Sequence, residues 1–355
     1  MSLLLRVLSD MPNTQSMNLQ KLTEKILGKG GRISVEISLV IMQVGICIAI
    51  LIFATKFLNY VVCGLEMNDY CNNDYFLAIF TAMIVIPLSF ISNMHYFYYP
   101  SLLATFFIFA NIVMQLFFNY QQIETLTSDE IFNRMKVFNF SELPKFFGVA
   151  TYAFEGIGCI FSVRSSMKKP SNFLSILKTQ MTLVTILYAI FPGSSELAYG
   201  QDTKEIILFN IPITYRICLG VQGLYVLAQL FGFPVQLHPV VNILESSKTF
   251  KNILFDKNGN NKNMLLRFGI RVILIIFMLT IAITTKSFNN FLNLLGSGVF
   301  VYLGYLLPII SYHFYFKSRV SKIFTVFNCI AFPISLVLGV IGVTISIQTI
   351  ISDSE

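Results

Sequence analysis

The sequence predicts an all-α fold: a polytopic helical membrane protein with nine spans. Hydrophobic residues make up 55% of the chain and charged residues only 12%, whereas a soluble domain carries about 25% charged residues. The hydrophobic residues fall in runs of about 20, the length that a helix needs to cross a bilayer core. The net charge of +7 is expected to come from loops between spans, so it does not indicate a nucleic-acid surface.

Nine apolar runs are predicted to cross the membrane as helices, and the second and fourth are near the lower length limit. We expect residues 1–32 to form a cytoplasmic N-terminal segment and residues 33–350 to form one transmembrane transporter domain. In chain order the runs are Ile33–Asn59, Tyr75–Ile91, Tyr98–Phe118, Phe146–Val163, Phe173–Phe191, Pro212–Leu237, Met264–Thr284, Phe291–Phe314 and Ile323–Ile350.

Basic residues are distributed unequally between the loops, and this asymmetry indicates the orientation. With a cytoplasmic N-terminus, the segments 1–32, 164–178, 245–271 and 317–322 carry 18 of the 25 lysines and arginines. Cytoplasmic loops are enriched in these two residues. We therefore expect the N-terminus in the cytoplasm.

Cys63 and Cys71 share a short loop that this orientation places on the non-cytoplasmic side. Disulfides persist in oxidising compartments. A disulfide between the two residues is one interpretation, and two free thiols are the other.

The most informative stretch is Phe146–Pro170, because Glu155 lies at the centre of an apolar run and is followed by Gly156 and Gly158. A carboxylate at mid-bilayer costs about 2.5–3.5 kcal/mol on insertion scales, and each glycine costs a helix roughly 1 kcal/mol relative to alanine. One interpretation is a helix that opens here to hold a ligand with its backbone. The other is a glutamate that faces a bundle interior, beside glycines for close helix packing.

Several segments resemble the amino acid/auxin permease family of transporters, which includes proton-coupled amino-acid transporters. Leu143–Pro170 resembles the family's sixth helix, and the other matching segments come in the family's order. These are Leu27–Phe53 (third helix), Ala198–Pro212 and Leu230–Glu245 (the loop before the eighth helix and its end), and residues 265–350 (ninth to eleventh helices). The chain departs from the family by lacking the first helix and most of the second, as a fragment would.

This resemblance implies a partial inverted-repeat, LeuT-like transporter fold, in which broken first and sixth helices form the substrate site. It implies a secondary active transporter of small amino acids, coupled to a proton or sodium gradient. The membrane would be the plasma membrane or a vacuolar or lysosomal membrane. The alternative is a truncated or non-transporting member that acts as a nutrient sensor or partner subunit. We expect no enzyme activity, cofactor, metal or nucleic acid, because the chain shows no phosphate loop, nucleophile elbow or metal-ligand cluster.

The resemblance implies substrate contacts in the opened segment, at Phe154, Glu155, Gly156, Ile157 and Gly158. Free amides at the start of the second half-helix would favour a carboxylate. Glu155 would attract an ammonium group or carry the coupling proton, since burial raises the pKa of a carboxylate.

Weaker candidates lie on other spans. Gln43 would face the substrate cavity at the opened segment, and Tyr225 and Gln229, about one turn apart, would give one helix face that lines a pathway. For each the alternative is hydrogen bonding to a neighbouring helix. The same interhelical bonding is expected of Asn111 and Gln115. The run Gly296–Gly298 is typical of close helix packing.

Overall fold

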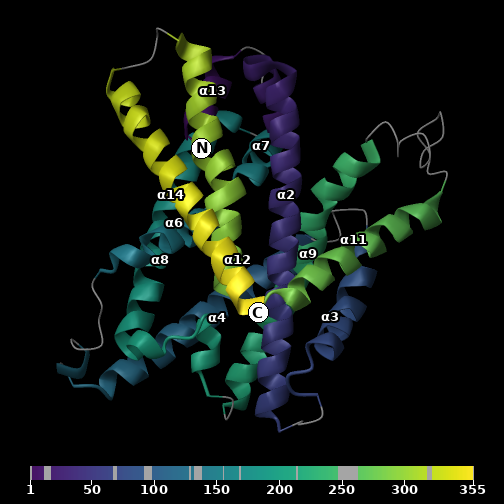
Figure 1. Ribbon diagram of the computed structural model, residues 1–355, viewed down its shortest axis with the longest axis vertical. Coiled ribbons are helices and arrows are strands. Elements are labelled where there is room, and N and C mark those ends of the chain that lie inside the picture. The colour runs from purple at the N-terminus through teal and green to yellow at the C-terminus, as the bar shows by residue number, and fades with distance from the viewer. Residues whose placement is uncertain are drawn as a thin grey trace. The chain divides into compact units, whose positions relative to one another are not determined.

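A computed structural model describes residues 2–11, 17–66, 70–91, 98–127, 129–131, 138–154, 156–167, 169–212, 215–246, 263–317 and 322–354, and every element within them is helical (Figure 1). Seven of the described helices are long and apolar enough to cross a membrane. They are α2 (Leu19–Gly64), α4 (Tyr98–Glu124), α8 (Phe173–Tyr199), α9 (Arg216–Ser246), α11 (Met264–Thr284), the stretch Phe288–Phe316 and α14 (Lys322–Ser354). The all-α membrane fold is confirmed, while the count of nine spans stays a prediction.

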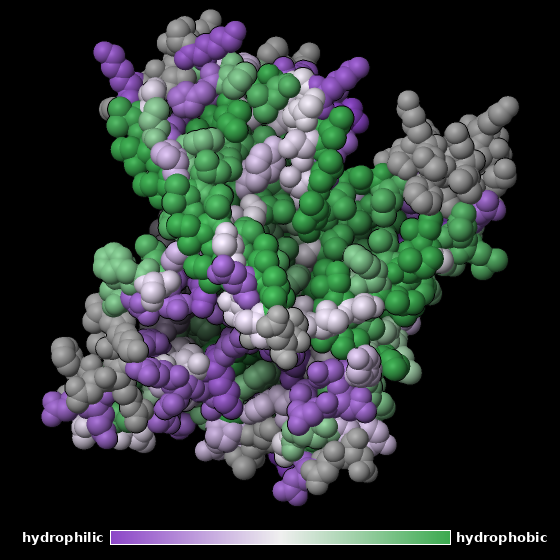
Figure 2. Space-filling model, viewed as in Figure 1, coloured by the Kyte–Doolittle hydropathy of each residue, from purple (hydrophilic) through white to green (hydrophobic). Residues whose placement is uncertain are grey.

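The long helices carry apolar side chains on their outer surfaces. Hydrophobic residues cover the visible faces of α14 and α11 (Figure 2). On α14, Phe327 is 66% exposed and Ile330 is 55% exposed. A soluble monomer rarely exposes such continuous apolar surface, so these faces are suited to contact with lipid.

The chain divides into two compact units, each described here by itself. Unit 1 consists of Met1–Met42, Asn139–Ile186 and Asn289–Glu355. Unit 2 consists of Gln43–Phe138 and Leu187–Phe288.

In unit 1, the described residues of the N-terminal segment 1–32 are largely helical. Helix α1 (Ser2–Asp10) packs against α13 (Leu307–Phe316) and buries Leu4 and Leu8. Its end is fixed by the Tyr315 hydroxyl, which donates to the Asp10 carboxylate at 3.1 Å. Apolar residues at helical spacing explain this helix. It was not among the predicted spans because its nine residues are far fewer than the roughly 20 that a span needs.

Helix α2 begins at Leu19, well before the predicted start at Ile33. Asn18 caps it, because its side-chain oxygen accepts a hydrogen bond from the Lys21 amide at 2.9 Å. Gly28 has φ +75°, which interrupts the helical geometry, and only glycine adopts this conformation without strain.

Close packing through glycines joins α6 (Leu143–Ala153) to the π-helix η6 (Gly296–Phe300) in unit 1. A Cβ atom on Gly296 would collide with the backbone of Gly148, and one on Gly148 would collide with Asn293 and Ser297. The expected packing role of the Gly296–Gly298 run is therefore confirmed at Gly296.

A buried amide fixes the next helix in the same bundle. Asn293, on α12 (Phe288–Leu295), donates to the Ser346 hydroxyl at 2.6 Å and to the Gly342 carbonyl at 3.2 Å, both on α14. Ser297 in turn donates to the Asn293 side-chain oxygen at 2.9 Å. In an apolar bundle such bonds hold helices in register.

Unit 2 is built around α9, which packs against both α4 and α3 (Asp74–Ser89). The part of α8 in this unit continues to Tyr199, although the predicted span stops at Phe191. The chain passes Pro192 as a helix, and the hydroxyls of Ser194 and Ser195 donate to the Phe191 carbonyl at 2.9 and 3.0 Å. Buried Asn119 on α4 donates to the same two hydroxyls at 3.0 and 2.9 Å.

Two arginines of α11 are held within unit 2. Arg267 forms a two-point ion pair with Glu245 at 2.8 and 2.9 Å, and Arg271, 5% exposed, donates to the Ser89 carbonyl. A buried guanidinium needs such acceptors.

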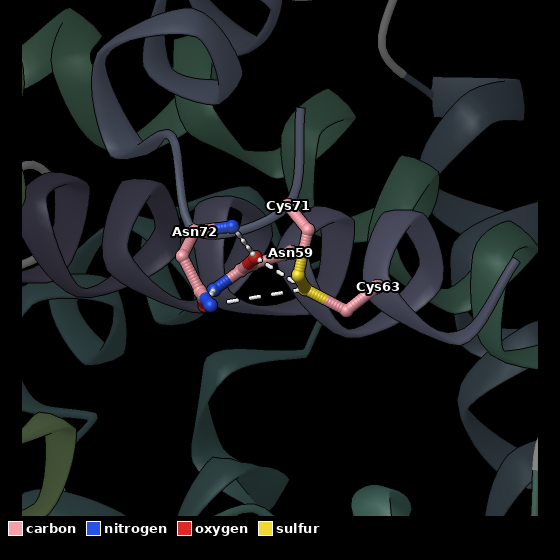
Figure 3. The surroundings of a disulfide bond; sticks show 4 residues. All are labelled: Asn59, Cys63, Cys71 and Asn72. Atoms are coloured by element: carbon pink, nitrogen blue, oxygen red, sulfur yellow. Dashed lines mark hydrogen bonds between the residues drawn. A yellow bond between two sulfur atoms is a disulfide. The ribbon is translucent and has the colours of Figure 1, made fainter. Parts of the chain in front are cut away.

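Cys63 and Cys71 form a disulfide with a Cα–Cα distance of 4.8 Å (Figure 3). Asn59 supports the loop that the disulfide closes, because its side-chain oxygen accepts the Asn72 amide at 2.9 Å. The same oxygen lies 3.1 Å from the Cys63 sulfur. A disulfide sulfur carries no proton, so this is a contact without hydrogen bonding.

Removing the disulfide should destabilise the protein. A short closed loop loses about 2–3 kcal/mol of stabilisation when its cross-link is removed, so the Cys63→Ser/Cys71→Ser variant should melt at a lower temperature in detergent. Cys329→Ser, which removes an exposed free thiol, is the matched control. Equal melting of both variants and wild type, or labelling of Cys63 without a reductant, would contradict the assignment.

Candidate functional site

The predicted sixth-helix span is interrupted in the structure, as one of the two sequence interpretations requires. Helix α6 ends at Ala153 and α7 (Ile157–Ser166) begins four residues later, and the two appear as separate ribbons in Figure 1. The Phe154 amide still bonds to the Ala150 carbonyl at 3.0 Å. Phe154 is therefore the C-cap of α6, and Glu155 itself lies outside the described residues.

Gly156 is the N-cap of α7 and offers no side chain to cap it. Its carbonyl accepts the Ile160 amide at 3.2 Å, which is the first turn of the new helix. Ile157 is buried and anchors that turn. The N-terminus of α7, which carries the partial positive charge of a helix start, therefore lies at the interruption between α6 and α7.

A separate cavity of about 350 Å³ lies within unit 2. Ligand pockets typically measure about 300–1,000 Å³ and are mostly apolar with a few polar groups, and this cavity fits that description. Its lining residues are Phe53, Ile108, Asn111, Ile112, Leu187, Tyr188, Phe191, Glu205, Ile206, Ile207, Leu208, Tyr225 and Phe288.

Aromatic rings form one wall of this cavity. Phe53 of α2 meets Tyr225 of α9 edge-on, with ring centroids 5.5 Å apart, and lies 6.2 Å from the ring of Phe288. Edge-to-face pairs add about 0.5–1.5 kcal/mol beyond their buried area. The rings of Phe53, Tyr225 and Phe288 therefore pack against one another along this wall.

The connection between α8 and α9 contributes the residues from Glu205 to Leu208. Buried Gln222 of α9 donates to the Leu208 carbonyl at 3.1 Å, which attaches the connection to the helix. Within the connection, the Asn210 side chain accepts the Lys204 amide at 2.9 Å and donates to the Asp202 carbonyl at 3.0 Å. These bonds hold the segment in one conformation.

Glu205 is the centre of a polar network beside the cavity. Its carboxylate accepts the Ser287 hydroxyl at 2.6 Å, the Phe288 amide at 3.3 Å and the Lys56 ammonium at 3.3 Å. Partial burial raises the pKa of this carboxyl, but the bond from Ser287 and the charge of Lys56 outweigh it, so the pKa lies below its ordinary value. Glu205 is therefore ionised at neutral and mildly acidic pH.

The sequence-predicted site residues are distributed between the two units. Phe154, Gly156, Ile157 and Gly158 belong to unit 1, whereas Gln43, Tyr225 and Gln229 belong to unit 2. Tyr225 and Gln229 share a side-chain hydrogen bond, and Tyr225 lines the cavity. Gln43 is 5% exposed, does not line the cavity, and its side-chain oxygen has no hydrogen-bond partner in the described part of the chain.

Sequence reasoning missed the cavity residues Asn111 and Glu205. Asn111 was expected to bond to another helix, but its buried side-chain oxygen has no partner within the described ranges, and the residue lines the cavity. Gln115 donates to Asn119 of its own helix at 2.9 Å, and Asn119 makes the interhelical contacts. A polar residue in the middle of an apolar run was the available signal for Asn111.

Within the described residues, no group of histidine, cysteine, aspartate or glutamate side chains could hold a metal ion.

The comparisons with known proteins agree on one family. The family model described as "Transmembrane amino acid transporter protein" matches residues 1–352. Vacuolar amino acid transporter 4 of Saccharomyces cerevisiae is 31% identical over 302 residues, which is 80% of this chain and 42% of that protein. The chain thus spans less than half the length of this relative.

Two further relatives come from other kingdoms. Amino acid transporter AVT3A of Arabidopsis thaliana is 28% identical over 341 residues, covering 93% of this chain and 74% of the relative. Proton-coupled amino acid transporter-like protein pathetic of Drosophila melanogaster is 24% identical over 240 residues, which is 66% of this chain and 48% of that protein. By these names, the relatives are transporters and not enzymes.

Proposed function

Because the chain belongs to the family of transmembrane amino acid transporter proteins, we propose that it moves small amino acids across a membrane as a secondary active transporter. The observation that carries this proposal is the interruption between α6 and α7 in an apolar segment. A simple membrane anchor has no need of a broken helix, whereas transporters use one to bind substrate with backbone groups.

In this proposal the substrate contacts the segment from Phe154 to Gly158. Backbone amides at the start of α7 bind the substrate carboxylate, supported by the positive end of the half-helix. Glu155 attracts the substrate ammonium or carries the coupling proton, since an ionised carboxylate is costly in an apolar span. Gln43, Tyr225 and Gln229 contribute polar contacts along the pathway.

The driving ion is a proton or sodium. The name of the Drosophila relative, a proton-coupled amino acid transporter-like protein, supports the proton. The names of the yeast relatives are those of vacuolar transporters, which supports a vacuolar or lysosomal membrane over the plasma membrane.

Counterflow tests the transport proposal without requiring the driving ion to be known. Proteoliposomes preloaded with unlabelled alanine should accumulate external radiolabelled alanine transiently, and liposomes without protein are the control. Correctly inserted protein that shows no counterflow with any small neutral amino acid would favour a sensor or partner subunit instead.

Orientation gives a separate prediction: the loop 164–172 faces the cytoplasm and the segment 124–142 faces the opposite side. The uneven distribution of lysine and arginine motivates it. Ser171→Cys and Asp129→Cys, each in a Cys329→Ser background, should react with an impermeant maleimide from opposite sides of the membrane. Labelling of both positions from the same side would refute the orientation.

A further inference from the structure

The cavity of unit 2 contains one polar atom whose hydrogen-bonding capacity is unused. Asn111 is 4% exposed, and its side-chain oxygen has no hydrogen-bond partner among the residues that the structure describes. Leaving a buried acceptor unsatisfied destabilises a protein, and native proteins rarely leave one without a reason. Since Asn111 lines the cavity, a ligand that donates a hydrogen bond there would relieve this cost.

The charge of the lining selects the kind of donor. Among the described residues that line the cavity, Glu205 carries the only full charge. The nearby cation, Lys56, is not a lining residue, and its ammonium is already bonded to the Glu205 carboxylate and to the Lys286 carbonyl at 2.7 Å. A ligand carboxylate would find no lining cation to bind it, whereas a ligand ammonium would find the Asn111 acceptor and the Glu205 carboxylate, whose charge Lys56 offsets only in part.

The remainder of the lining selects the body of the ligand. Phe53, Phe288 and the aliphatic side chains of Ile108 and Ile112 make the cavity mainly apolar. Burying apolar surface contributes about 25 cal/mol per Å², so a branched aliphatic or aromatic group fits better than a polar one. Tyr188 and Tyr225 add hydroxyl groups at the lining.

We propose that this cavity binds a primary ammonium group carried on an apolar body, with Asn111 as hydrogen-bond acceptor and Glu205 as the neighbouring negative charge. The site goes beyond the substrate site proposed above, because it does not use the interrupted helix and Tyr225 is the one residue that the two share. It recognises amines, including the amine end of an amino acid with an apolar side chain.

Three related probes separate the parts of this proposal. Isoamylamine has an ammonium and a branched alkyl group, 4-methylpentanoate has the same alkyl group with a carboxylate, and leucine has both charged groups. Equilibrium binding of each radiolabelled probe is measured to the purified protein in detergent. We expect isoamylamine to bind and 4-methylpentanoate to bind at least about tenfold more weakly, because a hydrogen bond to a charged group contributes about 1.5–3 kcal/mol. Equal binding of the two would show an unspecific apolar cavity and overturn the ammonium assignment.

Variants locate the binding. Asn111→Leu keeps the volume of the side chain and removes the acceptor, so isoamylamine affinity should fall about tenfold or more. Gln115→Leu is the matched control, because Gln115 is an equally buried amide on the same helix that does not line the cavity, and its affinity should equal that of wild type.

Unchanged affinity in Asn111→Leu, or no binding of isoamylamine to wild type, would refute the site. These outcomes are distinct from a failure of the transport proposal. Binding is measured without any movement of solute across a membrane, and counterflow of alanine does not require the cavity to bind amines.

Discussion

The Glu155→Gln variant is expected to lose most of its gradient-driven amino-acid uptake at mildly acidic pH and to show a flattened pH profile. The physical reason is that glutamine keeps hydrogen-bonding capacity but carries neither a charge nor a transferable proton. A hydrogen bond to a charged group contributes about 1.5–3 kcal/mol, so uptake should fall about tenfold or more. The measurement is initial uptake into proteoliposomes from mildly acidic to neutral pH, with membrane insertion checked separately.

Glu205→Gln is the matched control for this experiment. The Glu205 carboxyl has a pKa below its ordinary value, owing to the bond from Ser287 and the charge of Lys56, so it does not change protonation between mildly acidic and neutral pH. Its replacement can lower the rate, but the shape of the pH profile should remain that of wild type. An unchanged profile in Glu155→Gln would remove Glu155 from the coupling mechanism, and a flattened profile in Glu205→Gln would show that the flattening is not specific to Glu155.

The Gly296→Ala variant is expected to be the most destabilising conservative substitution in unit 1. The added Cβ would overlap the backbone of Gly148, and a backbone cannot move away as a flexible side chain can. Overpacking of this kind typically costs about 1–3 kcal/mol, and sometimes more. Thermal unfolding of the purified protein in detergent should therefore begin at a clearly lower temperature.

Gly304→Ala provides the comparison within the same unit. Gly304 lies in the neighbouring π-helix η7 (Tyr302–Leu306), and a Cβ there has no heavy atom within 4 Å. This variant should melt at or slightly above the wild-type temperature, because alanine favours helix over glycine. Equal melting temperatures of Gly296→Ala and Gly304→Ala would show that the close approach of α6 and η6 does not determine the stability of the protein.

The sequence predicted the helices best where a single apolar run determines them. Met264–Thr284 has the same bounds in the prediction and in the structure, because no proline lies within it and the polar residues Asn263 and Thr285 flank the run. The interruption between α6 and α7 was one of the two interpretations of the sequence, since a charged residue followed by glycines within an apolar run makes a continuous helix costly. The extension of α8 to Tyr199 was not, because it depends on serine hydroxyls bonding to the Phe191 carbonyl.

The unit 2 cavity was beyond sequence reasoning for a different reason. Its polar residues Asn111, Glu205 and Tyr225 come from α4, the α8–α9 connection and α9. Only tertiary packing brings them together, and neither periodicity nor motif spacing reports on such distant pairs. The resemblance to a transporter family implied a substrate site at the interrupted helix and implied no role for Asn111.

Gradient-driven accumulation of an amino acid tests the central claim most directly. Proteoliposomes that contain the protein are given radiolabelled alanine under an imposed proton gradient, an imposed sodium gradient, or neither. The account predicts accumulation above the external concentration with one of the two gradients, and its loss when an ionophore dissipates that gradient. Correctly inserted protein that equilibrates no alanine under any of the three conditions would contradict the proposal of secondary active transport.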